Sequence, residues 1–500
     1  MNKTTRLALF MAMVFQGVVR ADVTSHSFFY IEPSYRSASP IKESFFRTVR
    51  VDLAENGWGG AFEVVPFGGK STDGNEIARF FLPFGKSCII VAEDNAPDAA
   101  TRDVDARHLN IETLTDSFES QVCWCPRQTV IGAGFTFKQT LWRNCDDEAK
   151  VWFEVSFPVM RVSNSVGFKE TIIGNNTGGG AVNAIGLDNA PRVGTATQAF
   201  AQSNWNYGRV IAGTEMKKTG VADVELKLWY NSFLRECCHS SWFLGVIVPT
   251  GNRPCAKFVF EPIIGNNKHV GVEWGSSIGF DCIWSCGQHV LSWKLDTASR
   301  YLFRNHQFRS FDLEDKQWGR YMETYANQSD ALAAAAASNA DSGTSGINVF
   351  TERVRVTPRF AGDITTAFLY KYCHFVAEAG FNLFMRQAET VRPQCNDEPT
   401  AALKDVSGLG NTTIARTIRY EFADEVILPA NYAPIPVSEH NYESAAHPAV
   451  ISHTVYGTIG WDFDDCRIPT VIGVGGSYDF THANTALHRW LVWGKIGISY

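Results

Sequence analysis

The chain has 500 residues, of which 19% are charged and 13% aromatic, and its formal net charge is −7. Soluble domains usually carry about 25% charged residues, and a negative balance without a basic cluster argues against a nucleic-acid partner. The mean hydropathy of −0.12 shows that the apolar residues are interleaved with polar ones. This combination is typical of a sheet with one face in lipid and the other in water.

The first 21 residues have the composition of an export signal. Lys3 and Arg6 form a positive n-region, residues 7–14 form an apolar h-region, and Val19 and Ala21 are the small residues before a cleavage site. The apolar run is too short to span a membrane comfortably, and no run of about 18 apolar residues follows it. We therefore expect residues 1–21 to be a cleaved signal peptide that directs export through a bacterial inner membrane.

Residues 22–105 lack the regular pattern of the rest of the chain. They contain short apolar stretches, two Gly-Gly pairs at 59–60 and 68–69, and an acidic patch at Glu93 and Asp94. Three interpretations of this N-terminal region stay open: a plug, a periplasmic cap, or early strands with a large loop.

The twelve cysteines are compatible with an oxidising compartment, where disulfides form. Cys123 and Cys125 flank Trp124 on a predicted strand, which places the two residues about 7 Å apart and too far for an easy bridge to each other. The run from Cys237 to His239 offers metal-ligand side chains, but no pair of Cys-x-x-Cys units occurs, so a disulfide or inert strand end is preferred. We predict no metal and no cofactor, and the disulfide connectivity stays open.

Apolar and polar residues alternate in many segments from about residue 106 onwards. A period of two is expected for strands with one apolar face. The clearest segment begins at Val270 and alternates over about a dozen residues, close to the ~9–11 needed to cross a bilayer at a tilt. The other segments, in chain order, cover residues 131–138, 151–157, 223–231, 291–296, 363–371, 374–386 and 472–480.

This pattern predicts an all-β fold, a transmembrane antiparallel β-barrel of 12–14 strands that occupies residues 106–500. The strands are long, their polar faces carry many glycines and charges, and aromatic residues lie near strand ends, as in the interfacial girdles of barrels. A secreted soluble β-protein also alternates and is the alternative. The girdle candidates are Trp284, Tyr301, Phe303, Trp461, Phe463 and Phe480.

Long connections interrupt the alternation near residues 164–221, 304–345 and 387–446. They are rich in Gly, Asn, Ala or Pro, and one contains an alanine run at 333–337 within a helix-favouring stretch. Segments of this kind are typical of extracellular loops or of a constriction folded into the lumen.

The polar faces of the predicted strands carry charges of both signs. A Lys or Arg that faced lipid at mid-membrane would cost about 2–4 kcal/mol, whereas charges in the lumen tune ion selectivity. We therefore predict that eight residues face the lumen: Glu225, Lys227, Glu273, Asp281, Lys294, Asp296, Glu378 and Arg386. They either line an open pore or fill a closed barrel as a salt-bridged network, and the width of such a barrel favours the pore.

Residues 220–303 resemble part of a transporter family. A predicted strand from Val246 ends on Pro249, Thr250 and Gly251, and a Gly-rich strand follows from Val270. The arrangement is similar to the FadL-type transporters of fatty acids and aromatic hydrocarbons and to the barrels linked to phenol degradation. The resemblance is confined to this stretch and carries over no ligand-binding residue.

The last eleven residues form the most specific pattern in the chain. One face of this predicted final strand carries Trp490, Val492, Ile496, Ile498 and Tyr500, and only Gly494 interrupts the bulky series. A terminal aromatic residue preceded by alternate apolar residues resembles the C-terminal assembly signal of bacterial outer-membrane barrels. The resemblance implies an outer-membrane location, contact with outer-membrane lipid and recognition by the barrel-assembly machinery.

We predict that the protein is not an enzyme but an outer-membrane channel or transporter for passive uptake of small or hydrophobic solutes. A surface-exposed adhesin or structural protein, with the long loops as its working part, is the alternative. An outer-membrane lipase or protease is a third hypothesis. Ser452 with His453, and His374 with Glu378, are its candidate pieces, but neither Gly-x-Ser-x-Gly nor His-Glu-x-x-His occurs.

Overall fold

The computed structural model describes most of the chain after residue 24. The described ranges are 25–30, 59–93, 95–97, 101–144, 149–173, 184–235, 238–314, 316–325, 343–394, 402–403, 440–464 and 466–500. The expected signal peptide, residues 1–21, and the alanine run at 333–337 lie outside these ranges.

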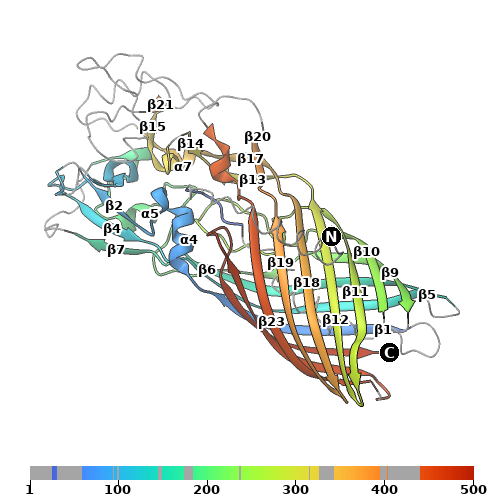
Figure 1. Cartoon of the computed structure of the whole chain (residues 1–500). Coiled ribbons are helices and arrows are strands. Elements are labelled where there is room, and N and C mark those ends of the chain that lie inside the picture. Colours follow the sequence, from blue (N-terminus) through green and yellow to red (C-terminus); the bar gives the residue numbers. More distant parts are fainter. Residues whose placement is uncertain are drawn as a thin grey trace, which may run out of the picture.

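Twelve antiparallel strands form a closed barrel, which confirms the predicted fold class (Figure 1). In order around the barrel they are β5 (Arg127–Arg143), β1 (Gly60–Ser71), β25 (Arg489–Ser499), β24 (Thr470–Thr481), β23 (Val450–Phe463), β19 (Phe375–Arg386), β18 (Arg359–Tyr372), β12 (His289–Leu302), β11 (Gly271–Cys286), β10 (Cys238–Val248), β9 (Val224–Arg235) and β6 (Ala149–Ser165). Pairing of β6 with β5 closes the sheet, and β8 (Met216–Val221) pairs with the end of β6.

The barrel begins earlier than the sequence indicated. Its first strand, β1, starts at Gly60 and pairs with both β5 and β25, so the barrel includes residues 60–71 of the region for which early strands were one of the three interpretations. The alternation is weak in β1 because Val65 and Phe67 on its inward face are as apolar as Phe62 and Val64 on its outward face. An apolar inward face hides the period of two on which the boundary rested.

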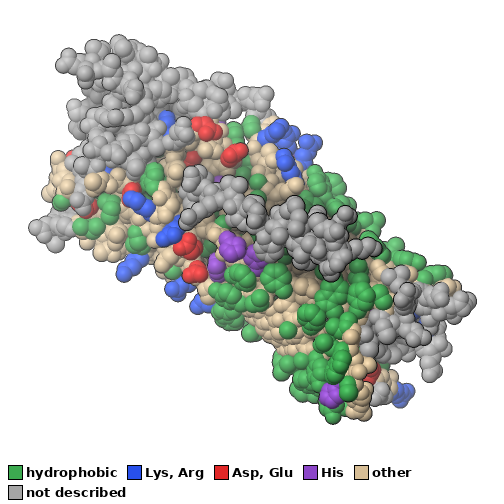
Figure 2. All heavy atoms as spheres, in the orientation of Figure 1, with side chains coloured by type: hydrophobic (Ala, Val, Ile, Leu, Met, Phe, Trp, Pro, Cys, Tyr) green, Lys and Arg blue, Asp and Glu red, His purple; other side chains and the backbone are tan. Residues whose placement is uncertain are grey.

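The outward faces of the strands form an apolar belt. On β10, for example, Trp242 and Leu244 are 59% and 67% exposed, whereas Phe243 between them is buried. Figure 2 shows hydrophobic side chains spread over the barrel half of the molecule. A belt of this kind is stable against the hydrocarbon of a bilayer and unfavourable in water.

The two ends of the barrel differ in the length of their connections. At one end the strands are joined by short segments, residues 144–148, 236–237, 287–288, 373–374 and 464–469. The chain ends there too, where Gly60 and Tyr500 exchange backbone hydrogen bonds of 2.8 and 3.0 Å. A Cβ at Gly60 would lie 2.5 Å from the Tyr500 ring, so a larger residue at this position would displace the ring.

At the other end, the long connections fold together into what we call the cap. Its strands form a sheet of β3 (Val104–Asp105), β2 (Cys88–Ala92), β4 (Glu119–Cys123) and β7 (Lys169–Ile172), a sheet of β13 (Asn305–Ser310), β17 (Thr351–Thr357) and β20 (Thr390–Pro393), and short pairings among β14 (Asp312–Leu313), β22 (His440–Asn441), β15 (Glu323–Tyr325), β16 (Thr344–Ser345) and β21 (Ala402–Leu403). Its helices are α4 (Gly74–Phe81), α5 (Ala196–Phe200) and α7 (Gly346–Val349), with 3-10 turns at Pro83–Gly85, Ala106–Leu109, Leu187–Asn189, Gly319–Tyr321 and Tyr442–Ala445.

The cap has a hydrophobic core of its own, formed by residues from many connections. Trp124, Phe200, Trp318 and Tyr321 pack there with ring centroids 5.0–6.0 Å apart, and all four side chains are buried. None of the described helices is long and apolar enough to span a membrane.

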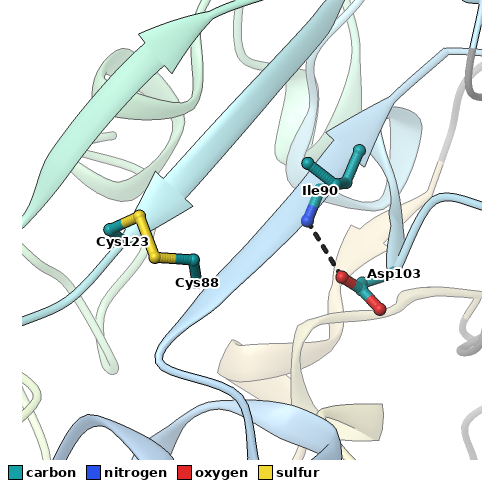
Figure 3. The surroundings of a disulfide bond; sticks show 4 residues. All are labelled: Cys88, Ile90, Asp103 and Cys123. Carbon is teal, nitrogen blue, oxygen red and sulfur yellow. Dashed lines mark hydrogen bonds between the residues drawn. A yellow bond between two sulfur atoms is a disulfide. The ribbon is translucent and has the colours of Figure 1, made fainter. Parts of the chain in front are cut away.

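A disulfide ties two strands of the cap together. Cys88 on β2 and Cys123 on β4 lie opposite each other in the antiparallel register and are bonded (Figure 3). Asp103 accepts a hydrogen bond of 3.0 Å from the backbone N–H of Ile90 on the same strand as Cys88. Cys125 is free, so Cys123 pairs outside its own strand.

The predicted C-terminal signal can be separated from simple lipid contact. Ile498 and Tyr500 face outward near the end of β25, where a Lys costs only about 0–1 kcal/mol against lipid. We expect Ile498→Lys with Tyr500→Lys to lower the yield of assembled barrel about tenfold or more, because these two residues carry the pattern that resembles a C-terminal assembly signal. The measurement is the heat-modifiable band of outer-membrane fractions on a denaturing gel.

Phe62 supplies the matched control for that pair. It lies directly opposite Ile498 on β1, at the same depth and on the same outward face. Phe62→Lys is expected to leave assembly within about twofold of the unmodified chain. Equal losses from both variants would show that lipid contact alone explains the effect.

Candidate functional site: the barrel interior and its mouth

The structure places seven of the eight sequence-predicted lumen residues on the inward faces of the strands. Glu273 is 1% exposed, whereas its neighbour Trp274 on the outward face is 41% exposed. The other buried members are Glu225, Lys227, Lys294, Asp296, Glu378 and Arg386. The eighth, Asp281, has a side chain that falls outside the described part of the structure.

Three of these residues meet in one group of ion pairs. Lys227 Nζ lies 2.9 Å from Glu225 Oε2 and 3.7 Å from Glu273 Oε1. Two residues that were not predicted complete the group, because Lys227 Nζ lies 3.9 Å from Glu154 Oε1 and Arg300 lies 3.5 Å from Glu225 and 3.3 Å from Glu273. We call these five residues the interior charge cluster. The sequence pattern could have identified Glu154 as an inward residue, because it alternates with the outward residues of β6.

The interior charge cluster brings together residues from four strands. They come from β6, β9, β11 and β12, and β12 is not hydrogen-bonded to β9 or β6. Burial of a charge costs several kcal/mol unless good partners offset it. The cluster holds three acidic and two basic groups, so most of this cost is offset internally.

Other inward charges are paired along the seam between β5, β1 and β25. Glu63 Oε1 lies 3.3 Å from Lys138 Nζ, and Glu63 Oε2 lies 2.9 Å from Lys495 Nζ. Glu378 accepts a hydrogen bond of 2.9 Å from the Tyr456 hydroxyl. The inward charges along this seam therefore have partners of opposite sign or hydrogen-bond partners.

The N-terminal residues Ser25–Tyr30 lie inside the cap at the mouth of the barrel, by which we mean the cap-side end. The backbone N–H groups of His26 and Ser27 donate to the carbonyls of Phe80 and Ser444 at 2.8 and 2.9 Å. Phe29 is part of the cap core. Because Gly60 lies at the opposite end of the barrel, this segment and the start of β1 are held at opposite ends of the molecule.

Two aromatic rings of the N-terminal segment stack on buried arginines. The Phe28 ring lies 3.2 Å from the Arg309 guanidinium, and the Tyr30 ring lies 3.7 Å from that of Arg386. A desolvated cation–π contact contributes about 2 kcal/mol. Burial raises the pKa of Tyr30 to about 12, so its hydroxyl stays protonated and donates to Asn266 at 3.3 Å. Arg386, predicted as a lumen residue, thus contacts the N-terminal segment.

The outer wall of the barrel carries a hollow of about 1220 Å³ across β5, β1, β25, β24, β23, β19, β18 and β12. Small outward residues form its floor, among them Gly68, Ala379, Gly457 and Gly494. Larger apolar residues border it, namely Ile131, Phe368, Ile459, Val474 and Val492. The shape follows from the sequence, because a strand without outward side chains leaves its backbone exposed.

The residue pairs considered for hydrolysis are engaged elsewhere. His374 hydrogen bonds at 3.0 Å to the carbonyl of Asp462, at the short-connection end, while Glu378 is bound by Tyr456 in the interior. Ser452 donates at 3.5 Å to the carbonyl of Phe480. Among the described residues no group of three or more His, Cys, Asp or Glu is arranged to hold a metal ion.

No protein-family model matches the chain, and no curated protein matches it. Solved structures that resemble it include the COG4313 outer membrane channel of Pseudomonas putida F1, at 9% identity over 88% of this chain and 96% of that one, with a TM-score of 0.39. The toluene transporter TbuX of Ralstonia pickettii has 8% identity over 88% and 89% of the two chains and a TM-score of 0.28. A Pseudomonas aeruginosa FadL homologue has 7% identity over 89% of both chains and a TM-score of 0.27. Likeness at this level transfers no substrate.

Four histidines, three of them buried and His26 partly buried, make the cap sensitive to acid. Burial lowers the pKa of His26, His269 and His440 to about 4, and lowers that of His447 well below its usual 6.5. An unfolded cap would take up these protons first, so the stability that they contribute above pH 6.5 is lost as the pH falls towards 4.

We therefore expect hydrogen exchange, corrected for its intrinsic pH dependence, to speed up in the cap between pH 6.5 and 4 while the barrel strands stay protected. His26→Phe keeps the ring that stacks on Phe80 and removes one titrating group, so its cap should lose less protection. Equal pH dependence in cap and barrel would contradict this account.

Proposed function

We propose that the protein is an outer-membrane channel or transporter for small or hydrophobic solutes. In this proposal the short connections lie in the periplasm and the cap lies outside the cell, as is usual for outer-membrane barrels. Residues 1–21 act as the export signal, and Ser25–Tyr30 close the mouth of the barrel.

The observation that carries the proposal is the interior charge cluster. A barrel that served only as an anchor would be at least as stable with an apolar filling, because replacing buried ion pairs by apolar residues is often neutral or stabilising. Mixed charges along the interior are instead typical of lumens in which polar groups set selectivity. The cluster therefore supports a path for solutes rather than a structural plug.

In this proposal the described state is the closed one. The members of the interior charge cluster are only 1–5% exposed, and the N-terminal segment is seated in the cap above them. Opening requires Phe28 to leave Arg309, which lies on β13 in the cap. It also requires Tyr30 to leave Arg386, the last residue of β19. Opening also requires that Phe29 leave the cap core and that the backbone hydrogen bonds of His26 and Ser27 break, so several non-covalent contacts together hold the closed state.

The outer hollow supports apolar solutes as one class of cargo. Its border is almost entirely apolar, and it lies beside Glu378 and Thr458 on the inward faces of β19 and β23. An apolar molecule in the hollow would be separated from the interior by a wall without bulky outward side chains.

A surface function is the second candidate, and the cap favours it. The cap has its own aromatic core and a disulfide, which are features of an independently stabilised binding domain. If well-folded protein shows no conductance in planar bilayers, both with and without residues 22–30, this candidate is favoured.

Ion selectivity tests the transport proposal with opposite variants of one cluster. Glu225→Gln with Glu273→Gln leaves Glu154 facing Lys227 and Arg300, so the cluster changes from one net negative to one net positive charge. We expect conductance in planar bilayers to shift towards anions, because lumen charges set ion preference. The measurement is the reversal potential in a KCl gradient, with heat-modifiable migration as the check on folding.

Lys227→Gln with Arg300→Gln is the matched control. It leaves three carboxylates and should shift the reversal potential towards cations, in the opposite direction. Shifts of the same sign in both variants, or none in conducting protein, would rule out the cluster as part of the path.

A further inference from the structure

Three cap strands continue the wall of the barrel beyond the mouth. The strand order β13-β17-β20 repeats the order β12-β18-β19, and each cap strand is joined to its barrel strand by a few residues. Val354 and Val391 on this small sheet are buried in the cap core. Its opposite face therefore lies outside, above the apolar belt.

The outer face of this sheet carries a row of basic side chains. His306 on β13 lies opposite Arg355 on β17, and Arg355 lies opposite Arg392 on β20. Arg353 is two residues from Arg355 on the same face, beside Phe308. We call His306, Arg353, Arg355 and Arg392 the outer basic patch.

The outer basic patch has no acidic partner within the described residues. None of its three arginines forms an ion pair there, and like charges directly opposite each other on strands repel. Burial and the nearby Arg353, Arg355, Arg253 and Arg304 lower the pKa of His306, so several positive charges converge on this point. Such a surface is stabilised by an external anion.

The height of the patch above the belt indicates which anion is available. Phe303 is exposed at the end of β12, where aromatic residues mark the edge of the hydrocarbon. His306 follows three residues later, about 10 Å further along the strand at roughly 3.3 Å per residue. For a strand tilted by about 35–45° this is about 7–8 Å of height above Phe303. The headgroup layer extends about 5–8 Å beyond the hydrocarbon. Figure 2 shows Lys and Arg side chains just beyond the hydrophobic belt at this end of the barrel.

We propose that the outer basic patch binds the phosphate groups of a phosphorylated glycolipid in the outer leaflet, with its acyl chains against the belt below. Arginine suits this ligand because its planar guanidinium donates two parallel hydrogen bonds to phosphate oxygens. The adjoining Arg304, between the end of β12 and the start of β13, lies on the membrane side of the patch and extends its positive field towards the headgroups. The proposal rests on the outer-membrane location and not on transport.

The test uses the purified full chain in detergent and bisphosphorylated lipid A as the probe. Arg353→Gln, Arg355→Gln and Arg392→Gln together should weaken binding about 100-fold, as judged by native mass spectrometry, since basic residues near an anionic membrane surface contribute in an additive way. The charge-matched control is Arg127→Gln, Lys169→Gln and Arg467→Gln, three exposed residues elsewhere. This control should bind within about threefold of the unmodified chain.

Dephosphorylated lipid A and soluble glucosamine phosphate complete the experiment. The unmodified chain should bind dephosphorylated lipid A as weakly as the triple variant binds the full probe. Equal binding of dephosphorylated lipid A would show that the belt alone holds the lipid, and equal binding of soluble glucosamine phosphate would identify a free anion as the ligand. Equal loss in both triple variants would overturn the proposal, and heat-modifiable migration verifies that each variant is folded.

Discussion

Closure of the sheet is the constraint on which the rest of this molecule depends. Within a bilayer no water satisfies a backbone N–H or C=O group, so a membrane sheet is stable only when its last strand pairs with its first. Here β25 pairs with β1 and β5 pairs with β6. The Tyr500 ring lies against Gly60 at that seam, so close that a side chain at residue 60 would displace it. The last strand, β25, therefore completes the closed sheet that begins with β1.

Closure also fixes which residues are buried together. Once outward positions face lipid, every alternate residue must point into the interior, so charges that are distant in sequence become neighbours. Arg300 meets Glu225 in this way, although 75 positions separate them. The interior cannot be filled with charges of one sign, because buried charges without partners cost several kcal/mol each. Ion pairing is thus a consequence of the polar inward faces, and a change at one member affects all the others.

The sequence predicted the barrel because most strands obey a strict period of two. Glu273 between Val272 and Trp274 is a clear example. It left open whether residues 22–105 form a plug, a cap or early strands, since β1 is apolar on both faces. It gave no sign of the cap core, which joins residues such as Trp124 and Trp318 from separate connections. Parity assigned seven lumen residues to the inward faces, but ion pairs depend on register between strands, which parity does not give. The aromatic rings of Phe28 and Tyr30 gave no signal at all.

The change of parity at the mouth explains why the outer basic patch was invisible in the sequence. Inward residues are even-numbered in β12 and β19, as with Arg300 and Arg386, but odd-numbered in β13 and β20, as with Arg309 and Val391. A one-residue shift between each pair of strands moves the next side chains to the other face. Arg386 and Arg392 are an even number of positions apart, yet the first lies inside at the N-terminal segment and the second outside. One continuous strand path therefore contributes to closure of the mouth and to the surface above the membrane.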